Sequence, residues 1–248
     1  MSTQERRRRE RDTREQLFIQ TAQDLIRRDG LLHLQMSRLA EACDYATGTL
    51  YQHFSSKEDL LMAIATEDLK RRATAFEPIP SLPATSRERM LAVMLADIDF
   101  ISSHPDHFQL LQYVSTEVVW ASASLERRQA LVRAGAPISE AVSRVVAHAI
   151  HAGDLVGIPS LRPVEIAAGF WCLNTGMHTL AHTHGLLEAY AVRDPYALLI
   201  HHGHALLNGL GWQPLVDTGN TKAVIDEAER VRALLVRSAN PEAPVVTS

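Results

Sequence analysis

The chain has 248 residues, of which 46% are hydrophobic and 22% charged, a composition typical of soluble globular proteins. Its formal net charge of −4 excludes a strongly basic chain, so a surface that binds nucleic acid would have to be a local concentration of positive charge. The chain has only two cysteines, no apolar run long enough to cross a membrane, and a charged rather than apolar N-terminus, so we expect a cytoplasmic protein with neither a disulfide scaffold nor a membrane partner.

Residues 1–12 are rich in charge and poor in apolar side chains, which predicts a flexible basic arm. Its arginines are Arg6, Arg7, Arg8, Arg9 and Arg11. Such a segment serves either solubility or contacts with the phosphates and minor groove of DNA. A DNA-binding module directly downstream would favour the second interpretation.

The next segment, residues 13–60, shows the periodicity of three helices. Apolar residues recur at helical spacing between Leu17 and Ile26, and Gly30 is placed to end this first helix. The three helices are expected over residues 13–29, 37–43 and 47–54. A turn over residues 44–46 joins the second to the third.

The third of these helices has two different faces. Leu50 and Phe54 are placed to pack against the first two helices. The outward positions are polar, and they are Thr47, Thr49, Gln52 and His53. Two short helices joined by a turn and packed on a third helix form a helix-turn-helix unit, whose outward side can enter a groove of DNA.

The remainder, residues 61–239, is expected to form a helical bundle, and residues 240–248 a flexible tail. Its helices are expected over residues 57–76, 85–103, 105–121, 125–152, 163–184, 194–210 and 221–237. A break is expected at Gly135–Pro137, because proline interrupts helical hydrogen bonding. No strand-like alternation stands out, so the fold class is all-α, with a small N-terminal domain and a larger C-terminal one.

A specific motif lies between Met36 and Leu60. It consists of Leu39-Ala40, then Gly48-Thr-Leu-Tyr-x-His-Phe54, then Lys57-Glu-Asp-Leu60. In these residues the sequence resembles the TetR family of bacterial transcriptional regulators. The resemblance covers about the first quarter of the chain.

The turn departs from the family pattern at three positions. Asp44, Tyr45 and Ala46 stand where the family usually has glycine, a small aliphatic residue and a capping serine. Aspartate tolerates left-handed backbone, so we expect the turn to survive. Tyr45 is left with two roles, packing or contact with a phosphate.

The resemblance implies roles for individual residues. Thr47, Thr49 and Gln52 would contact bases in the major groove, and Gly48 would let the helix backbone approach DNA closely. Phosphate contacts would set the register, and their residues would be Ser37, Arg38, Tyr51, His53 and Lys57.

The resemblance also implies a homodimer on a palindromic operator of double-stranded DNA, with the helices over 163–184 and 194–210 forming the dimer interface. Repression, relieved by a small-molecule inducer in the C-terminal domain, is the family's usual mode. The expected lining of the inducer site is aromatic and apolar with a few polar groups. It comprises Phe100, His104, Phe108, Leu111, Tyr113, Glu117, Trp120, His148, Trp171, Asn174 and His178.

The histidines permit an alternative for the sensing site. Glu117, His148, His178 and His182 could present ligands to a metal from facing helices, and this centre would sense metal or redox state. Hydrogen-bonded histidines without metal are the favoured interpretation, because no strict ligand motif is present. An enzyme is the least favoured alternative, since the chain lacks a nucleophile–base motif and a cofactor fingerprint.

Overall fold

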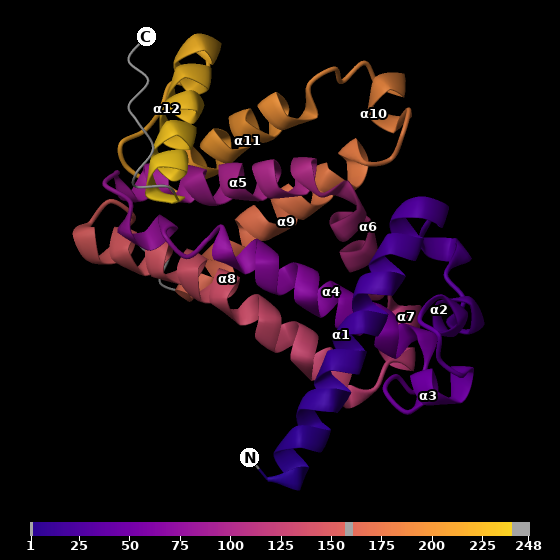
Figure 1. Cartoon of the computed structure of the whole chain (residues 1–248). Helices are drawn as coiled ribbons and strands as arrows, with labels where there is room; N and C mark the ends of the chain where they lie inside the picture. Colours follow the sequence, from indigo (N-terminus) through magenta and orange to yellow (C-terminus); the bar gives the residue numbers. More distant parts are fainter. Residues whose placement is uncertain (1, 157–160, 240–248) are drawn as a thin grey trace. The chain divides into compact units, whose positions relative to one another are not determined.

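The computed structural model describes residues 2–156 and 161–239, and within these ranges the chain is helical and contains no β-strand (Figure 1). This confirms the all-α class. The predicted tail at 240–248 lies outside the described residues. None of the described helices is both long and apolar enough to span a bilayer.

The chain divides into two compact units, whose boundaries differ from the predicted domain boundary at residue 60. The first unit comprises the residues up to Lys70 and Asp106–Ala134, and the second comprises Arg71–Pro105 and the described residues from Gly135 onward. The boundaries therefore fall within α4 (Lys57–Thr74) and α8 (Leu125–Ala152), and directly after the first residue of α6 (Pro105–Val114).

The first unit is built around the predicted helix-turn-helix. Its other elements are α1 (Thr3–Asp29), η1 (Leu31–His33), α2 (Met36–Ala42), α3 (Thr47–Tyr51), most of α6 (Pro105–Val114) and α7 (Glu117–Ser122). Phe18 of α1, Leu39 of α2 and Leu50 of α3 are fully buried together with Phe54. Helical spacing places these side chains on inward faces, so each short helix is held by the shared core rather than by its own length.

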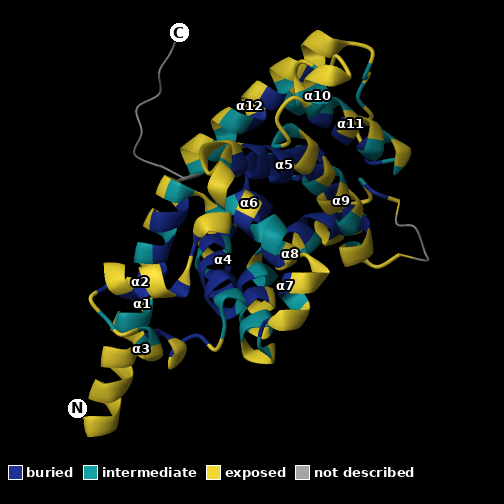
Figure 2. Ribbon diagram, turned by 90° about the vertical axis from the view of Figure 1, so that its right-hand side faces the viewer, coloured by how far each residue is buried: buried dark blue, intermediate teal, exposed yellow. Residues whose placement is uncertain are grey.

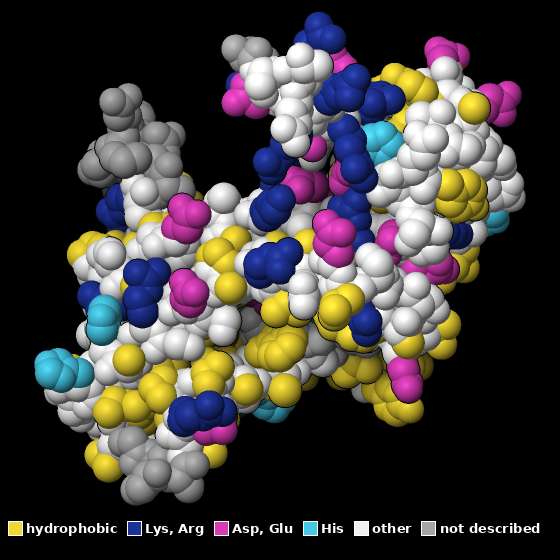
Figure 3. Space-filling view, turned by 90° about the horizontal axis from the view of Figure 1, so that it is seen from below, with side chains coloured by type: hydrophobic (Ala, Val, Ile, Leu, Met, Phe, Trp, Pro, Cys, Tyr) yellow, Lys and Arg dark blue, Asp and Glu magenta, His cyan; other side chains and the backbone are white. Residues whose placement is uncertain are grey.

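Helix α1 begins ten residues earlier than the sequence predicts. The Ser2 hydroxyl accepts from the backbone N–H of Glu5, whose carboxylate accepts from the N–H of Ser2, and this capping box starts the helix. The predicted flexible arm is therefore helical from Thr3, because extending a helix that the core already holds adds one hydrogen bond per residue fixed. Its first turns are exposed (Figure 2), and the face of the molecule seen from below carries a group of Lys and Arg side chains with Asp and Glu among them (Figure 3).

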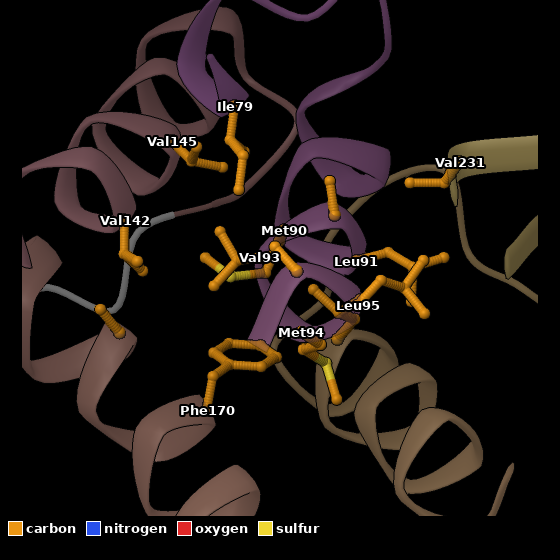
Figure 4. Packing of buried hydrophobic residues seen from close by; sticks show 14 of the residues in the cluster. Ile79, Met90, Leu91, Val93, Met94, Leu95, Val142, Val145, Phe170 and Val231 are labelled. Atoms are coloured by element: carbon orange, nitrogen blue, oxygen red, sulfur yellow. The ribbon is translucent and has the colours of Figure 1, made fainter. Parts of the chain in front are cut away.

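Helix α5 (Ser86–Ser103) is the centre of the second unit. It packs against α9 (Pro163–Ala181), α11 (Pro195–Gly209) and α12 (Thr221–Ala239). Successive α5 side chains, including Met90, Leu91 and Val93, point to different sides and meet residues of the surrounding helices (Figure 4). A helix that is apolar on nearly all sides is buried on nearly all sides, which explains its central place.

The predicted helix over 105–121 is two helices, α6 and α7. The Ser115 hydroxyl donates to the carbonyl of Leu111 and the Thr116 hydroxyl to that of Tyr113, each at 2.7 Å. These side chains compete with the backbone for hydrogen bonds, and Thr116 takes an extended conformation that starts α7. A four-residue helix that the sequence did not predict, α10 (Leu186–Ala189), follows α9.

The predicted break at Gly135–Pro137 is wrong, because α8 runs through Pro137 without interruption. A proline inside a helix removes one backbone hydrogen bond, and the packing of the remainder of the helix tolerates this loss. The boundary between the two units nevertheless falls at Ala134–Gly135, beside this weak point.

Candidate functional site

The turn between α2 and α3 depends on one left-handed residue. Asp44 has a φ of 57°, and the backbone N–H of Tyr45 donates to the carbonyl of Ala40 at 2.9 Å. The expected tolerance of Asp44 for this conformation is confirmed. The Tyr45 ring packs edge-on against Phe18 with 5.3 Å between the ring centroids, so of its two expected roles the structure supports packing.

Helix α3 is shorter than predicted, since it ends at Tyr51 with Gln52 as its C-cap. The backbone N–H groups of His53 and Phe54 both donate to the carbonyl of Leu50 at 3.0 Å, which closes the helix in a tight last turn. Leu50 and Phe54 lie inward and fully buried, as the apolar spacing predicts.

The outer side of α3 remains accessible. Tyr51 and Gln52 are exposed, and Thr47 and Thr49 are partly exposed. At Gly48 a Cβ atom would find no heavy atom within 4 Å, so nothing in the protein requires a glycine there. A helix side that is polar and unhindered is suited to contact with another molecule.

The other residues predicted to contact DNA surround this helix. Ser37 and Arg38 are exposed on α2, and the Arg38 guanidinium lies 3.0 Å from the carboxylate of Asp29. Lys57 is the first residue of α4 and is half-buried. All three therefore lie in the first unit with α3.

His53 is the exception, because its side chain is buried rather than outward. Its ring packs edge-on against Phe18 with centroids 5.3 Å apart, and Nδ1 lies 3.7 Å from the Glu15 carboxylate. Burial lowers the pKa of His53, although the charge of Glu15 opposes this. The prediction failed because α3 ends before residue 53, so helical periodicity does not apply to it.

Arg127, near the start of α8, contacts residues next to the end of α3, and Ser124 contacts α4. The Arg127 guanidinium lies 2.8 Å from the Glu15 carboxylate, donates to the His53 carbonyl at 3.2 Å and lies over the Phe54 ring at 5.1 Å. Asp59 accepts from the backbone N–H of Ser124 at 2.7 Å. Burial alone would raise the pKa of Asp59, but hydrogen bonds from Ser55 and Ser124 outweigh it and the pKa is lowered.

Sequence reasoning missed Arg127 and Asp59, because each acts on residues about 65 to 74 positions away along the chain. No local spacing signals such a contact. Together they make the orientation of α3 depend on residues outside the helix-turn-helix segment.

The residues predicted to line an inducer site are distributed over both units. Those of the first unit are Phe108, Leu111, Tyr113, Glu117 and Trp120, and those of the second are Phe100, His104, His148, Trp171, Asn174 and His178. Trp171 is 68% exposed and His148 is also exposed, so neither lines an interior site of the second unit. Trp120 lines a shallow hollow of about 290 Å³ together with Leu125 and Val132.

Asn174 and His178 do lie together, in a buried polar cluster around Asp97. Asp97 accepts from Nε of Arg72 at 2.9 Å and from Nδ2 of Asn174 at 3.1 Å, and it lies 3.4 Å from Nε2 of His178. Nδ1 of His178 lies 3.2 Å from the Tyr196 hydroxyl. Burial would raise the pKa of Asp97, but the charge of Arg72 and the hydrogen bond of His178 outweigh it and lower that pKa.

One atom of this cluster lacks a partner. Oδ1 of Asn174 is buried and makes no hydrogen bond with any described residue. An unpaired acceptor in an apolar core costs free energy, so the cluster has capacity for one more hydrogen-bond donor.

The alternative metal centre is not supported by the described residues. Glu117 is exposed in the first unit, whereas His148, His178 and His182 belong to the second. Across the described ranges, no three His, Cys, Asp or Glu side chains come together as a metal ion requires. The histidine spacing failed as a signal because His148 faces solvent and His178 is engaged with Asp97 and Tyr196.

Comparison with known proteins agrees with this geometry. Residues 18–64 match the family described as bacterial regulatory proteins, tetR family. The transcriptional regulator UidR of Escherichia coli K12 is 33% identical over 66 residues, or 26% of this chain and 34% of UidR. The fatty acid metabolism regulator protein of Bacillus subtilis is 26% identical over 112 residues, or 45% of this chain and 55% of that protein. The matched segment thus spans about a third to a half of these two regulators.

Solved structures extend the similarity of fold. A regulatory protein in the tetR family from Rhodococcus RHA1 has a TM-score of 0.58 at 17% identity, covering 82% of this chain and 98% of that chain. The regulator FadR from Bacillus subtilis, solved with stearoyl-CoA, has a TM-score of 0.58 at 18% identity, covering 78% and 98%. At these identities the likeness establishes the fold.

Proposed function

We propose that this chain, a TetR-family transcriptional regulator, acts as a homodimer that represses transcription from a palindromic operator until an inducer binds its second unit. The observation that carries the proposal is the outer side of α3, which is polar and accessible around Gly48. A side chain at Gly48 would meet nothing in the protein, so the absence of one is best explained by the approach of DNA.

Contacts with DNA follow from the placement of the side chains. Thr47, Thr49 and Gln52 would read base edges in the major groove, because they occupy the exposed side of α3. Phosphate contacts would come from the surrounding exposed or half-buried residues Ser37, Arg38, Tyr51 and Lys57. His53 is not among them, since its ring is buried.

The homodimer would form through α9 and α11. After Glu165 in its first turn, the exposed residues of α9 are uncharged and include Trp171, Gly176 and Leu180. Gly176 and Gly209 have open space where a Cβ would lie, which would let a second copy approach closely. Gly203 has a different role, because a Cβ there would clash with the Met94 side chain.

The inducer would be a molecule with a long apolar part and at least one hydrogen-bond donor. The core of the second unit is apolar, and the unpaired Oδ1 of Asn174 offers an acceptor beside Asp97. Since one relative is a fatty acid metabolism regulator and a protein of similar fold was solved with stearoyl-CoA, long-chain acyl-CoA esters, whose amide N–H groups can donate, belong in the first panel of ligands.

The decisive experiment is a search for the operator. Purified protein would be mixed with genomic fragments, and the fragments retained would be footprinted. We expect a symmetric protected site, and stearoyl-CoA and other panel members would be scored for release of the protein from it. Failure to retain any fragment at low salt without ligand would contradict DNA binding.

Substitutions separate the two kinds of contact. Lys57→Ala should weaken binding to every duplex and lower the slope of log affinity against log salt by about 0.9, whereas Lys70→Ala, on the same helix, should not. Gln52→Ala should alter the preference among operator variants by about 1–3 kcal/mol per base pair read, whereas Gln20→Ala on α1 should not. Unchanged preference in Gln52→Ala would contradict base readout by this side chain.

A further inference from the structure

The first turns of α1 precede the part of the helix that packs into the core. Every described residue up to Thr13 is exposed, and the first buried side chain is Phe18. At 1.5 Å per residue, Thr3 to Thr13 extends about 16 Å along the helix axis. Thr3 to Arg14 contains six arginines and three carboxylates, a surplus of three positive charges in a chain of formal charge −4.

Three of these arginines lie on one side of the helix. Arg7, Arg11 and Arg14 follow one another at intervals of four and three residues, and the same series continues to Phe18 and Leu25. Phe18 and Leu25 are the buried side of α1. The side of α1 that packs against α2 and α3 downstream therefore carries arginines upstream, where it extends past the packed region.

A contact places this row beside the candidate DNA-binding helix. The Arg11 guanidinium donates to the carbonyl of Gln52, the C-cap of α3, at 3.5 Å. Arg14 donates through Nε to the Glu10 carbonyl at 3.3 Å, which leaves its two terminal amino groups for other partners.

Of the three carboxylates in the segment, two lie away from the row and the third is paired with Arg6. At 3.6 residues per turn, Glu5 and Asp12 fall on the opposite side of the helix from the row, and the Glu10 carboxylate lies 3.5 Å from Nε of Arg6. Arg6 and Arg9 therefore belong to a different side from Arg7 and Arg11. Glu10 lies within one turn of Arg7 and Arg14, but three arginines against one carboxylate leave the row with a net positive charge.

We propose that Arg7, Arg11 and Arg14 form a phosphate-binding row that extends the DNA contact of α3 onto the adjoining backbone of the duplex. Double-stranded DNA carries one charge per ~1.7 Å of axis. A helical segment about 16 Å long, such as Thr3 to Thr13, can therefore lie along several phosphates. Guanidinium groups bind phosphate oxygens in bidentate geometry. The inference rests on the proposed DNA-binding function and adds a second binding element to it.

The test compares two variants that lose the same charge. Arg7→Gln/Arg11→Gln removes two members of the row, and Arg6→Gln/Arg9→Gln removes two arginines from another side. Binding of the full chain to a mixed-sequence duplex would be measured over a series of salt concentrations, with thermal unfolding as the check on folding. We expect the slope of log affinity against log salt to fall by about 1.8 in the first variant, and by less than half as much in the second.

Equal slopes in the two variants would overturn the row, because the effect would then be general electrostatics. An unchanged slope in Arg7→Gln/Arg11→Gln would also overturn it, provided that wild-type protein binds the duplex. If wild-type protein binds no duplex while remaining folded, the proposed function itself fails, which distinguishes the two failures.

Discussion

The outer side of α3 and the cluster around Asp97 use polar side chains in opposite surroundings. Around Gly48 the polar groups of α3 keep contact with solvent, whereas Asp97 and its partners Arg72, Asn174 and His178 are withdrawn from it. Exposed polar groups contribute little to folding and are available to a partner, while buried ones must satisfy one another. We therefore expect substitutions in the first region to change binding and those in the second to change stability.

The largest effect is expected at Asp97. Asp97→Ala would leave the Arg72 charge buried without its partner, and the free energy of unfolding should fall by about 3–5 kcal/mol. Asp97→Asn keeps the shape and some hydrogen bonds, so its loss should be smaller. Urea denaturation checks both, and a loss below about 1 kcal/mol in Asp97→Ala would mean that the cluster does not stabilise the fold.

Leu50 tests the inner side of α3, which is buried like the Asp97 cluster and is therefore expected to contribute to stability. Leu50→Ala should cost about 2–5 kcal/mol, because the side chain is fully buried and its removal leaves a cavity. Thermal and urea unfolding measure this loss. Wild-type stability in the variant would show that α3 does not need its inner face to fold.

A pH series distinguishes the buried histidine His204 from exposed ones. Burial first, and then the Arg87 charge, lower its pKa to about 4. The unfolded chain takes up a proton below its usual pKa while the folded chain does not, so His204 removes stability as the pH falls from about 6.5 toward 4. Between pH 7 and pH 5 this amounts to about 2 kcal/mol.

The measurement is the difference between wild-type protein and His204→Gln, with exposed His148→Gln as the control. The loss of stability on acidification should be smaller in His204→Gln than in wild-type protein. Equal losses in the two proteins would show that His204 is protonated as readily in the folded chain as in the unfolded one.

The smallest effect on stability, with a large one on binding, is expected at Gly48. Gly48→Ala should leave the protein as stable or up to about 1 kcal/mol more stable, since alanine favours helix and the Cβ meets nothing. Its affinity for DNA should nevertheless fall. Paired unfolding and binding curves test this, and wild-type affinity would show that the α3 backbone does not approach the duplex closely.

The orientation of side chains was predicted correctly within α3 and incorrectly beyond its end, for a physical reason. Leu50 and Phe54 were placed inward correctly, because the spacing of apolar residues within one helix determines which side is buried. His53 was placed outward incorrectly, because the helix ends two residues before it. Helical spacing predicts which side a residue faces only for residues within the helix.

Contacts between segments far apart in the sequence could not be predicted from local sequence patterns. The hydrogen bond from Arg127 to His53 and the one from Asn174 to Asp97 join residues more than 70 positions apart. In the same way, the alternative of a metal centre relied on spacing within single helices, and this spacing does not show whether Glu117 lies near His148. The arginine segment was expected to be flexible from its composition, and its helical state depends on the packed core downstream.

Residues at different positions of α3 have different roles. Leu50 holds the helix in the domain, while Thr47, Gly48 and Gln52 face away from it. A lineage that carries this helix is free to exchange the outward residues without passing through an unfolded intermediate. The same scaffold can thus acquire new targets by single substitutions, and a library randomised at the outward positions would consist mainly of folded proteins.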